Sequence, residues 1–196
     1  MERRRVAAVV VGLALASLAS PGRGGEIVSQ RAEFASAPAG IEVRSSAFAA
    51  NTPIPDRFSA YHDNQSPPLE WSGAPERTQA LVLVVEDPDA PGAEPFVHWL
   101  VTGVPASTHA LPAGPPDLPA LSALGDARQG MTSVGRAGWF GPRPPPGHAH
   151  HYHFQVFALD APLGIPPGFD REVLLAAMKG HVLARGDLVG TYERAR

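Results

Sequence analysis

Alternating and continuous runs of apolar residues predict a fold built mainly from β-strands. Residues 41–45 alternate between apolar and polar positions, as a half-buried strand does. Residues 81–85 read Leu-Val-Leu-Val-Val, a continuous apolar run that indicates a strand buried on both faces. Further strands are expected at residues 96–101, 154–159 and 188–192.

One segment has the features of a helix. Residues 171–179 follow Asp170, a residue type favoured at an N-cap, and Gly180 stands where a C-cap glycine belongs. The side chains expected to face the core are Val173, Leu174 and Ala177. Because strands dominate, the predicted fold class is all-β with one minor helix in the C-terminal region, arranged as a β-sandwich.

Composition supports a globular chain that is rich in turns. Apolar residues make up 44% of the 196 residues and charged residues 18%, which excludes a wholly disordered chain. The 20 glycines and 22 prolines argue against an all-helical bundle. A net charge of −3 gives no reason to expect a nucleic-acid partner. The absence of cysteine excludes disulfides, thiol catalysis and cysteine-based metal sites.

The N-terminus has the layout of a secretory signal peptide. Arg3, Arg4 and Arg5 precede an apolar and small-residue stretch at 6–19, which is shorter than the ~20 residues of a membrane-spanning helix. Small residues before Ser20 suit a cleavage site there. We therefore expect a periplasmic or secreted protein.

This interpretation divides the chain into three parts. We expect residues 1–19 to be the signal peptide, residues 20–40 a flexible lead and residues 41–196 a single domain. Without a cysteine after the signal, we expect no lipid attachment of the lipoprotein kind. Within the domain, residues 105–147 show little periodicity, which indicates a functional loop or short elements that the pattern does not reveal.

The first polar group directly follows the buried apolar run. Asp87 and Asp89 lie two residues apart in Asp-Pro-Asp-Ala-Pro, so an extended backbone would point both carboxylates the same way. His98 returns on the next predicted strand, within reach of both. Asp-Pro-Asp is also ordinary turn chemistry, and a histidine beside Trp99 is often simply packed.

The second polar group contains four of the eight histidines, within residues 148–153. If a strand begins near His150, then His150 and Tyr152 share one face while His151 and His153 take the other, so the four histidines cannot act as one ligand set. The preceding Gly-Pro sequence allows backbone amides to approach an anion. The same run could also be a rigid polyproline spacer with a histidine-rich edge.

Together these groups have a defined chemistry. The imidazoles of His98 and His150 and the phenol of Tyr152 can donate hydrogen bonds to a phosphate or carboxylate. Asp87 and Asp89 would be useful if they orient the imidazoles, hold them protonated or accept from an ammonium group. A zinc or manganese shell of aspartates and histidines is the rival interpretation.

These motifs resemble the phosphatidylethanolamine-binding protein family. Residues 87–91 with His98-Trp99 resemble its first signature, and residues 141–147 with His150-His151-Tyr152 resemble its second. Three further segments are similar to the bacterial, Raf kinase inhibitor-like branch of the family; they are residues 64–71, 180–184 and 190–192. The resemblance covers roughly residues 41–194.

The resemblance implies a β-sandwich of two antiparallel sheets with a Greek-key element. It also implies a pocket, at one end of the large sheet, that binds phosphate-like anions or phosphorylated head groups without a metal or cofactor. By position, the ligand-binding residues are expected to be Asp87, Asp89, His98, Gly141, Pro142, His150 and Tyr152. The chain departs from the family pattern at Phe140, usually tyrosine, and at Arg143, usually cysteine, where the charge could attract an anion or point to solvent.

Three classes of function remain open on the sequence alone. The favoured class is an exported binding module for a phosphate-like anion or a phosphorylated head group. A protein-interaction or inhibitor module, acting on a kinase or protease, is the first alternative. An Asp/His-dependent hydrolase or metal enzyme is the second, although no serine with a recognisable nucleophile elbow accompanies the histidines. We expect no membrane-spanning segment in the mature chain, and the sequence leaves open whether the protein forms a homo-oligomer.

Overall fold

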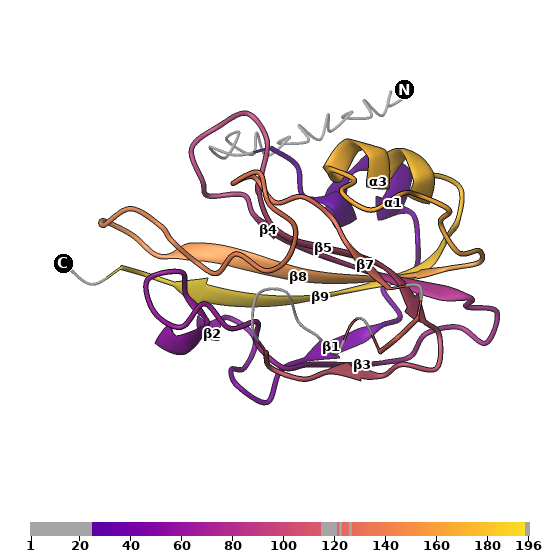
Figure 1. Cartoon of the computed structure of the whole chain (residues 1–196), viewed down its shortest axis with the longest axis horizontal. Coiled ribbons are helices and arrows are strands. Elements are labelled where there is room, and N and C mark those ends of the chain that lie inside the picture. Colours follow the sequence, from indigo (N-terminus) through magenta and orange to yellow (C-terminus); the bar gives the residue numbers. More distant parts are fainter. Residues whose placement is uncertain (1–24, 115–120, 122, 126, 195–196) are drawn as a thin grey trace, which may run out of the picture.

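A large sheet, a small sheet and a helical layer make up the protein (Figure 1). The computed structural model describes residues 25–114, 121, 123–125 and 127–194. The large sheet has the strand order β2-β9-β8-β4-β5-β7, and the small sheet the order β1-β3-β6. Neighbouring strands are antiparallel except for the short pair β2–β9. The all-β prediction with a minor helix is therefore confirmed.

The bounds of the elements are as follows. The strands of the large sheet are β2 (Thr52–Pro53), β4 (Ala80–Asp87), β5 (Phe96–Pro105), β7 (Arg128–Gln129), β8 (His150–Leu159) and β9 (Val182–Tyr192). The small sheet contains β1 (Glu42–Arg44), β3 (Leu69–Ser72) and β6 (Ala110–Leu111). The helices are α1 (Ala32–Ala35), α3 (Arg171–Met178) and the 3-10 turns η1 (Val28–Gln30) and η2 (Asp56–Phe58). Thus the stretch of low periodicity at 105–147 holds two short strands, β6 and β7.

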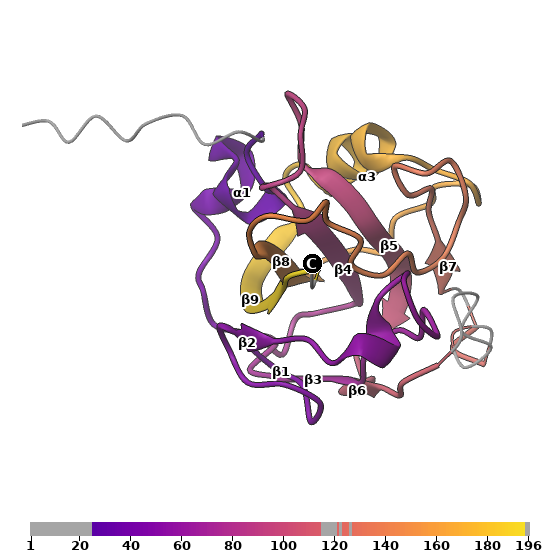
Figure 2. The same ribbon diagram turned by 90° about the vertical axis from the view of Figure 1, so that its left-hand side faces the viewer.

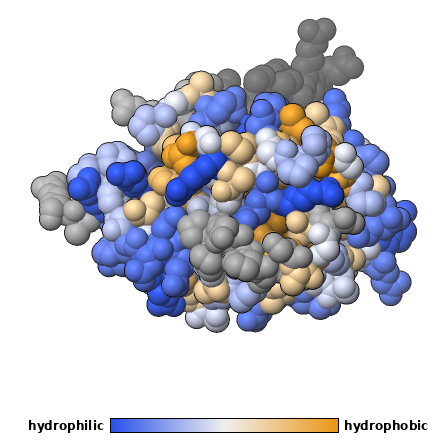
Figure 3. All heavy atoms as spheres, in the orientation of Figure 1, coloured by the Kyte–Doolittle hydropathy of each residue, from blue (hydrophilic) through white to orange (hydrophobic). Residues whose placement is uncertain are grey.

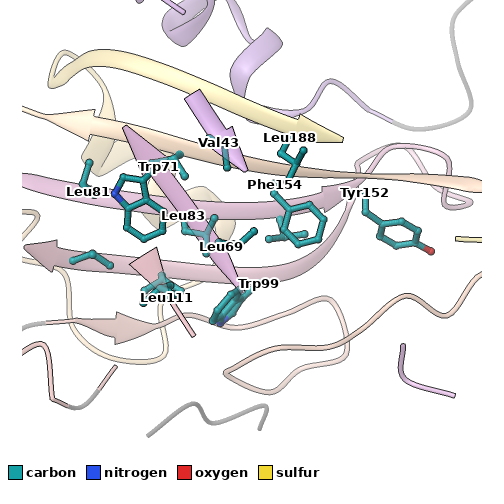
Figure 4. Close-up of a cluster of buried hydrophobic side chains, with 14 of the residues drawn as sticks. Val43, Leu69, Trp71, Leu81, Leu83, Trp99, Leu111, Tyr152, Phe154 and Leu188 are labelled. Carbon is teal, nitrogen blue, oxygen red and sulfur yellow. The ribbon is translucent and has the colours of Figure 1, made fainter. Parts of the chain in front are cut away.

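Strand β4 lies at the centre of the protein and is buried along its whole length. One face of β4 packs against the small sheet through Leu81, Leu83 and Val85, which belong to the cluster in Figure 4. The opposite face packs against the helical layer through Val82 and Val84. This double coverage is the reason for the continuous apolar sequence. Figure 2 shows β1, β3 and β6 together beneath the large sheet, with α1 and α3 on its other side.

Helix α3 begins and ends as expected, but it presents a different face to the sheet. The Asp170 side chain accepts a hydrogen bond from the backbone N–H of Val173 at 2.9 Å, and Gly180 has a φ of 84° just beyond the helix. Val173 is 43% exposed, so the prediction that it faces the core is wrong. Ala177 is only partly buried, although Leu174 is fully buried as predicted. The buried stripe follows the helical period through Arg171, Leu174, Leu175 and Met178.

The segment before β1 differs from the flexible lead that we expected. Residues 28–35 contain η1 and α1, and the side chains of Val28 and Phe34 are buried in the helical layer. Because this segment consists mainly of small, aperiodic residues, its sequence did not reveal that Val28 and Phe34 anchor it to the helical layer. The predicted signal peptide at 1–19 lies outside the described residues.

A buried charge network holds this segment and α3 to the large sheet. Glu86 is fully buried, and its carboxylate accepts from the Arg171 guanidinium at 2.6 Å and from the backbone N–H of Val28 at 2.8 Å. Gln155 donates to the same carboxylate at 2.8 Å and accepts from the backbone N–H of Ser29 at 2.7 Å. Every partner comes from a different part of the chain, so one carboxylate fixes the N-terminal segment, α3 and β8 together.

The described surface carries few large apolar side chains. In the face shown in Figure 3, polar and apolar residues are interspersed. The large hydrophobic residues that are exposed are Val134 and Val173. None of the helices among residues 25–114, 121, 123–125 and 127–194 has the length and apolar character needed to cross a membrane.

Removing Arg171 should destabilise the fold strongly. In Arg171→Ala the Glu86 carboxylate would stay buried without its cation, which should lower the free energy of unfolding by about 3–5 kcal/mol. The matched control is Arg44→Ala, because Arg44 pairs with Glu42 on the surface and such pairs contribute about 1 kcal/mol or less. Urea unfolding of both variants measures the two effects. Equal losses would show that the buried pair has no special role.

Candidate functional site

A small pocket opens where β4 ends and where β5 and β8 begin. Its volume is about 140 Å³, or roughly four to five water molecules at about 30 Å³ each. The residues that line it are Asp87, Ala90, Pro91, Phe96, His98, Phe140, Arg143 and His150. Three predicted residues, Asp87, His98 and His150, are thus brought together in one pocket with mostly apolar walls.

Asp87 and His150 form a buried pair at the base of this pocket. The Oδ2 atom of Asp87 lies 2.8 Å from Nδ1 of His150, and both side chains are almost fully buried. The other carboxylate oxygen accepts from the backbone N–H groups of Asp89 and Ala90, which fixes its orientation. Since Nδ1–H donates to the carboxylate, Nε2 is the free ring atom. It is buried and has no hydrogen-bond partner among the described residues.

His98 reaches the pocket because of a β-bulge. Val85 is opposite Trp99 while Glu86 is opposite Val97, so His98 is the extra residue on β5. Bulges commonly redirect a side chain next to a functional site. As a result, the His98 ring lies against Phe140, and its Nδ1–H donates a hydrogen bond to the Phe140 carbonyl at 2.5 Å.

Burial sets the charge of His98. It lowers the pKa of this imidazole to about 4, although the Phe140 carbonyl and the Asp87 carboxylate act in the opposite direction. The ring is therefore neutral near pH 7, with Nε2 as a hydrogen-bond acceptor. The expectation that nearby carboxylates keep His98 protonated, as a donor to an anion, is wrong for this reason.

Tyr152 contacts His98 but is not among the residues that line the pocket. Its ring is fully buried and meets the edge of the His98 ring at a centroid distance of 5.1 Å. Figure 4 shows its hydroxyl pointing away from the hydrophobic cluster. Burial, and secondly the charge of Asp87, raises the pKa of this phenol far above its ordinary value, so the hydroxyl keeps its proton. Like Nε2 of His150, the hydroxyl forms no hydrogen bond of ordinary geometry among the described residues, although the backbone amide of Arg143 is close enough to act against the rise in its pKa.

Asp89 does not point in the same direction as Asp87. Strand β4 ends at Asp87, and the following turn aims Asp89 at His151, whose Nδ1 and backbone N lie 2.7 and 2.8 Å from Oδ2. Burial alone would raise the pKa of Asp89, but these hydrogen bonds hold it below its ordinary value. Asp89 lines a neighbouring hollow of about 390 Å³ that shares His150 with the pocket. The predicted alternation holds, since His151 is exposed and His150 is buried.

Gly141 and Pro142 support the rim and do not line the pocket. The Gly141 amide donates to Oδ1 of Asn64 at 2.7 Å, so it is not free to bind an anion as the sequence suggested. A Cβ at this position would lie 2.1 Å from the Phe58 carbonyl oxygen, so only glycine fits. The Pro142 carbonyl accepts from the backbone N–H of Ala60 at 3.0 Å. These contacts place the neighbouring residues, Phe140 and Arg143, on the pocket wall.

Some residues of the site could not be recognised in advance. Asn64 belongs to the segment 64–71 that resembles the bacterial branch, but nothing in the sequence marks its side chain as the one that holds the rim. Phe96 and Pro91 line the pocket through packing alone, for which a single sequence carries no signal. Within the described ranges, no group of three or more histidine, aspartate or glutamate side chains is arranged to hold a metal ion.

The buried, neutral His98 should make stability depend on pH. Its folded-state pKa of about 4 lies below the ordinary 6.5, so the unfolded chain takes up a proton first and stability falls as the pH drops from about 6.5 to 4. The size of this contribution is roughly 3 kcal/mol. In His98→Asn, which keeps a donor near the Phe140 carbonyl but cannot titrate, the loss between pH 7 and 4 should shrink by about that amount.

Urea unfolding at several pH values checks this prediction. His109→Asn is the control, because His109 is exposed, and it should keep the wild-type slope. Parallel stability curves for the wild type and His98→Asn would show that His98 does not titrate as described.

Comparison with known proteins finds one matching family. The sequence profile of the family described as "Phosphatidylethanolamine-binding protein" matches residues 44–193. A UPF0098 protein of Pyrococcus horikoshii is 42% identical over 151 residues, covering 76% of this chain and 75% of the relative. LppC of Mycobacterium tuberculosis, named as a lipoprotein, is 37% identical over 159 residues, covering 78% and 72%.

Two crystal structures share the fold. The phosphatidylethanolamine-binding protein homologue CT736 of Chlamydia trachomatis has a TM-score of 0.72 and 35% identity, covering 80% of this chain and 99% of its own. YbcL of E. coli, described as a member of the mammalian family, has a TM-score of 0.74 and 28% identity, covering 80% and 100%. The chain therefore belongs to the phosphatidylethanolamine-binding protein family.

Proposed function

We propose that this protein binds a phosphate-like anion, or a phosphorylated head group, in the pocket at the ends of β4, β5 and β8. The observation that carries the proposal is a pair of buried polar atoms, Nε2 of His150 and the hydroxyl of Tyr152, that lack partners among the described residues. A buried polar group without a hydrogen bond costs about 1–3 kcal/mol. A ligand with several acceptor oxygens would satisfy the Tyr152 hydroxyl, and also Nε2 of His150 when that nitrogen carries a proton.

The charges around the pocket favour an anion. When His150 is protonated, Nδ1–H remains on Asp87 and Nε2–H becomes a donor to the ligand, while the Asp87 carboxylate balances the ring's charge. Arg143 lines the same pocket and supplies a permanent positive charge. Neutral His98 offers an acceptor, which suits the hydroxyl of a protonated phosphate or an ammonium group on the ligand.

The chemistry of the lining supports binding ahead of hydrolysis. Asp87 and His150 are paired as the aspartate and histidine of a catalytic triad would be, but the lining residues include no serine, threonine or cysteine that could act as a nucleophile. The matching family is itself described by its binding of phosphatidylethanolamine. A role as a protein inhibitor has no comparable observation behind it in the described residues.

We also propose that the protein is exported and acts in the periplasm or outside the cell. The arginine-rich start, the apolar stretch at 6–19 and the small residues that follow support a cleaved signal peptide. The similar LppC bears a name that describes it as a lipoprotein, a kind of exported protein, which supports the proposal although this chain has no cysteine for lipid attachment. The N-terminus of the native protein should lie near Ser20, and an intact Met1 in the cytoplasmic fraction would overturn this proposal.

Tyr152→Phe is the sharpest test of the binding site. The change removes only the hydroxyl, so the ring packing stays and the free protein should be as stable as the wild type or more stable. Binding of inorganic phosphate should weaken by about tenfold, the effect of losing one hydrogen bond to a charged ligand. Titration calorimetry measures affinity, and urea unfolding measures stability.

Tyr192→Phe is the matched control. The Tyr192 hydroxyl contacts Asp56 and Ser59, each at 3.1 Å, so its loss should lower stability by about 1 kcal/mol without changing phosphate affinity. His150→Gln, which removes the imidazole paired with Asp87, should weaken phosphate binding by about ten- to a hundredfold. Wild-type affinity in both Tyr152→Phe and His150→Gln would place the ligand elsewhere.

A further inference from the structure

A second hollow, which we call the arginine groove, adjoins the anion pocket. Its volume is about 420 Å³, and its lining consists of Ala60, Asn64, Val134, Arg136, Phe140 and Arg143. Phe140 and Arg143 also line the anion pocket, so the two hollows share a wall. None of the lining residues is acidic, whereas two are arginines.

Contacts with aromatic rings position the guanidinium groups of the arginine groove. Arg136 places its Cζ atom 5.6 Å from the centroid of the Phe140 ring, and Arg143 places its Cζ atom 5.7 Å from that of Tyr61. Such cation–π contacts hold a guanidinium while leaving its N–H donors free. Neither arginine forms an ion pair with a carboxylate of the described residues. Two uncompensated cations therefore face one hollow.

Asn64 adds an oriented neutral donor to the arginine groove. Its Oδ1 atom accepts from the Gly141 amide at 2.7 Å, and its backbone takes the left-handed conformation with a φ of 53°. Because Oδ1 is fixed as the acceptor, the NH2 group of the same side chain is the part left to donate to a ligand. An asparagine tolerates this conformation better than most residues do.

The two hollows share one aromatic ring, that of Phe140. The His98 ring stacks near Phe140 at a centroid distance of 6.0 Å, and Arg136 lies 5.6 Å from the same centroid. Arg143 bridges them, because it lines both. One extended ligand could therefore place an anionic group in the pocket and another in the groove.

We propose that the arginine groove is a second anion subsite, and that the ligand of this protein carries at least two anionic groups a few bonds apart. The proposal rests on the proposed function, since the first anionic group would occupy the pocket beside His150. Arg136 and Asn64 bind the second anionic group, and Arg143 contacts both anionic groups. A doubly phosphorylated small molecule has the required chemistry, and a linear polyphosphate is its simplest probe.

The experiment compares inorganic phosphate with linear triphosphate by titration calorimetry on the full mature protein. In the wild type, triphosphate should bind at least about tenfold more tightly than phosphate, through one or more additional charge-assisted contacts. In Arg136→Gln this gain should shrink by about tenfold, while the affinity for phosphate alone stays within about twofold. Arg77→Gln is the control, because exposed Arg77 precedes β4 at the end opposite Asp87, and it should keep the gain.

The possible failures are distinguishable. If the wild type binds no phosphate, the proposed function fails, and this inference fails with it. If phosphate binds but Arg136→Gln keeps the full triphosphate gain, the second subsite is overturned while the first stands. An equal loss of the gain in Arg136→Gln and Arg77→Gln would show that the gain reflects overall charge, which also overturns the subsite.

Discussion

Strand β4 carries two buried carboxylates in consecutive positions, and each requires compensation on a different face of the sheet. Because side chains alternate along a strand, Glu86 points to the helical layer and Asp87 points to the end of the sandwich interior. Glu86 finds Arg171, and Asp87 finds His150. The last two residues of β4 therefore hold the helical layer to the sheet and form part of the pocket.

The two carboxylates differ in whether every polar group around them has a hydrogen-bond partner. The Glu86 network is closed, since it receives donors from Arg171, Val28 and Gln155 and binds the N-terminal segment to the sheet. The Asp87 network is open, because its partner His150 leaves Nε2 without a hydrogen bond among the described residues. A closed network contributes stability and a single arrangement of elements, whereas an open one in a pocket offers a binding site for a ligand.

Local sequence patterns predicted those features that depend on local geometry. The buried run at 81–85, the N-cap at Asp170 and the alternation of His150 and His151 are consequences of strand or helix period and of cap chemistry. Features that depend on tertiary packing could not be predicted from the sequence. The direction of Asp89 depends on where β4 ends, and the charge of His98 depends on a bulge and on burial that only the assembled sheet creates. The anchoring of residues 26–35 depends on Glu86, which is distant in sequence.

A crystal structure of the protein grown with inorganic phosphate at a mildly acidic pH tests the binding site most directly. The geometry predicts one phosphate in the pocket, with oxygen atoms within hydrogen-bond distance of Nε2 of His150 and the hydroxyl of Tyr152, that is, at about 2.7–3.0 Å. Arg143 should contact the same phosphate. A pocket that holds only water at saturating phosphate, or a phosphate ordered away from both atoms, would contradict the assignment of this site.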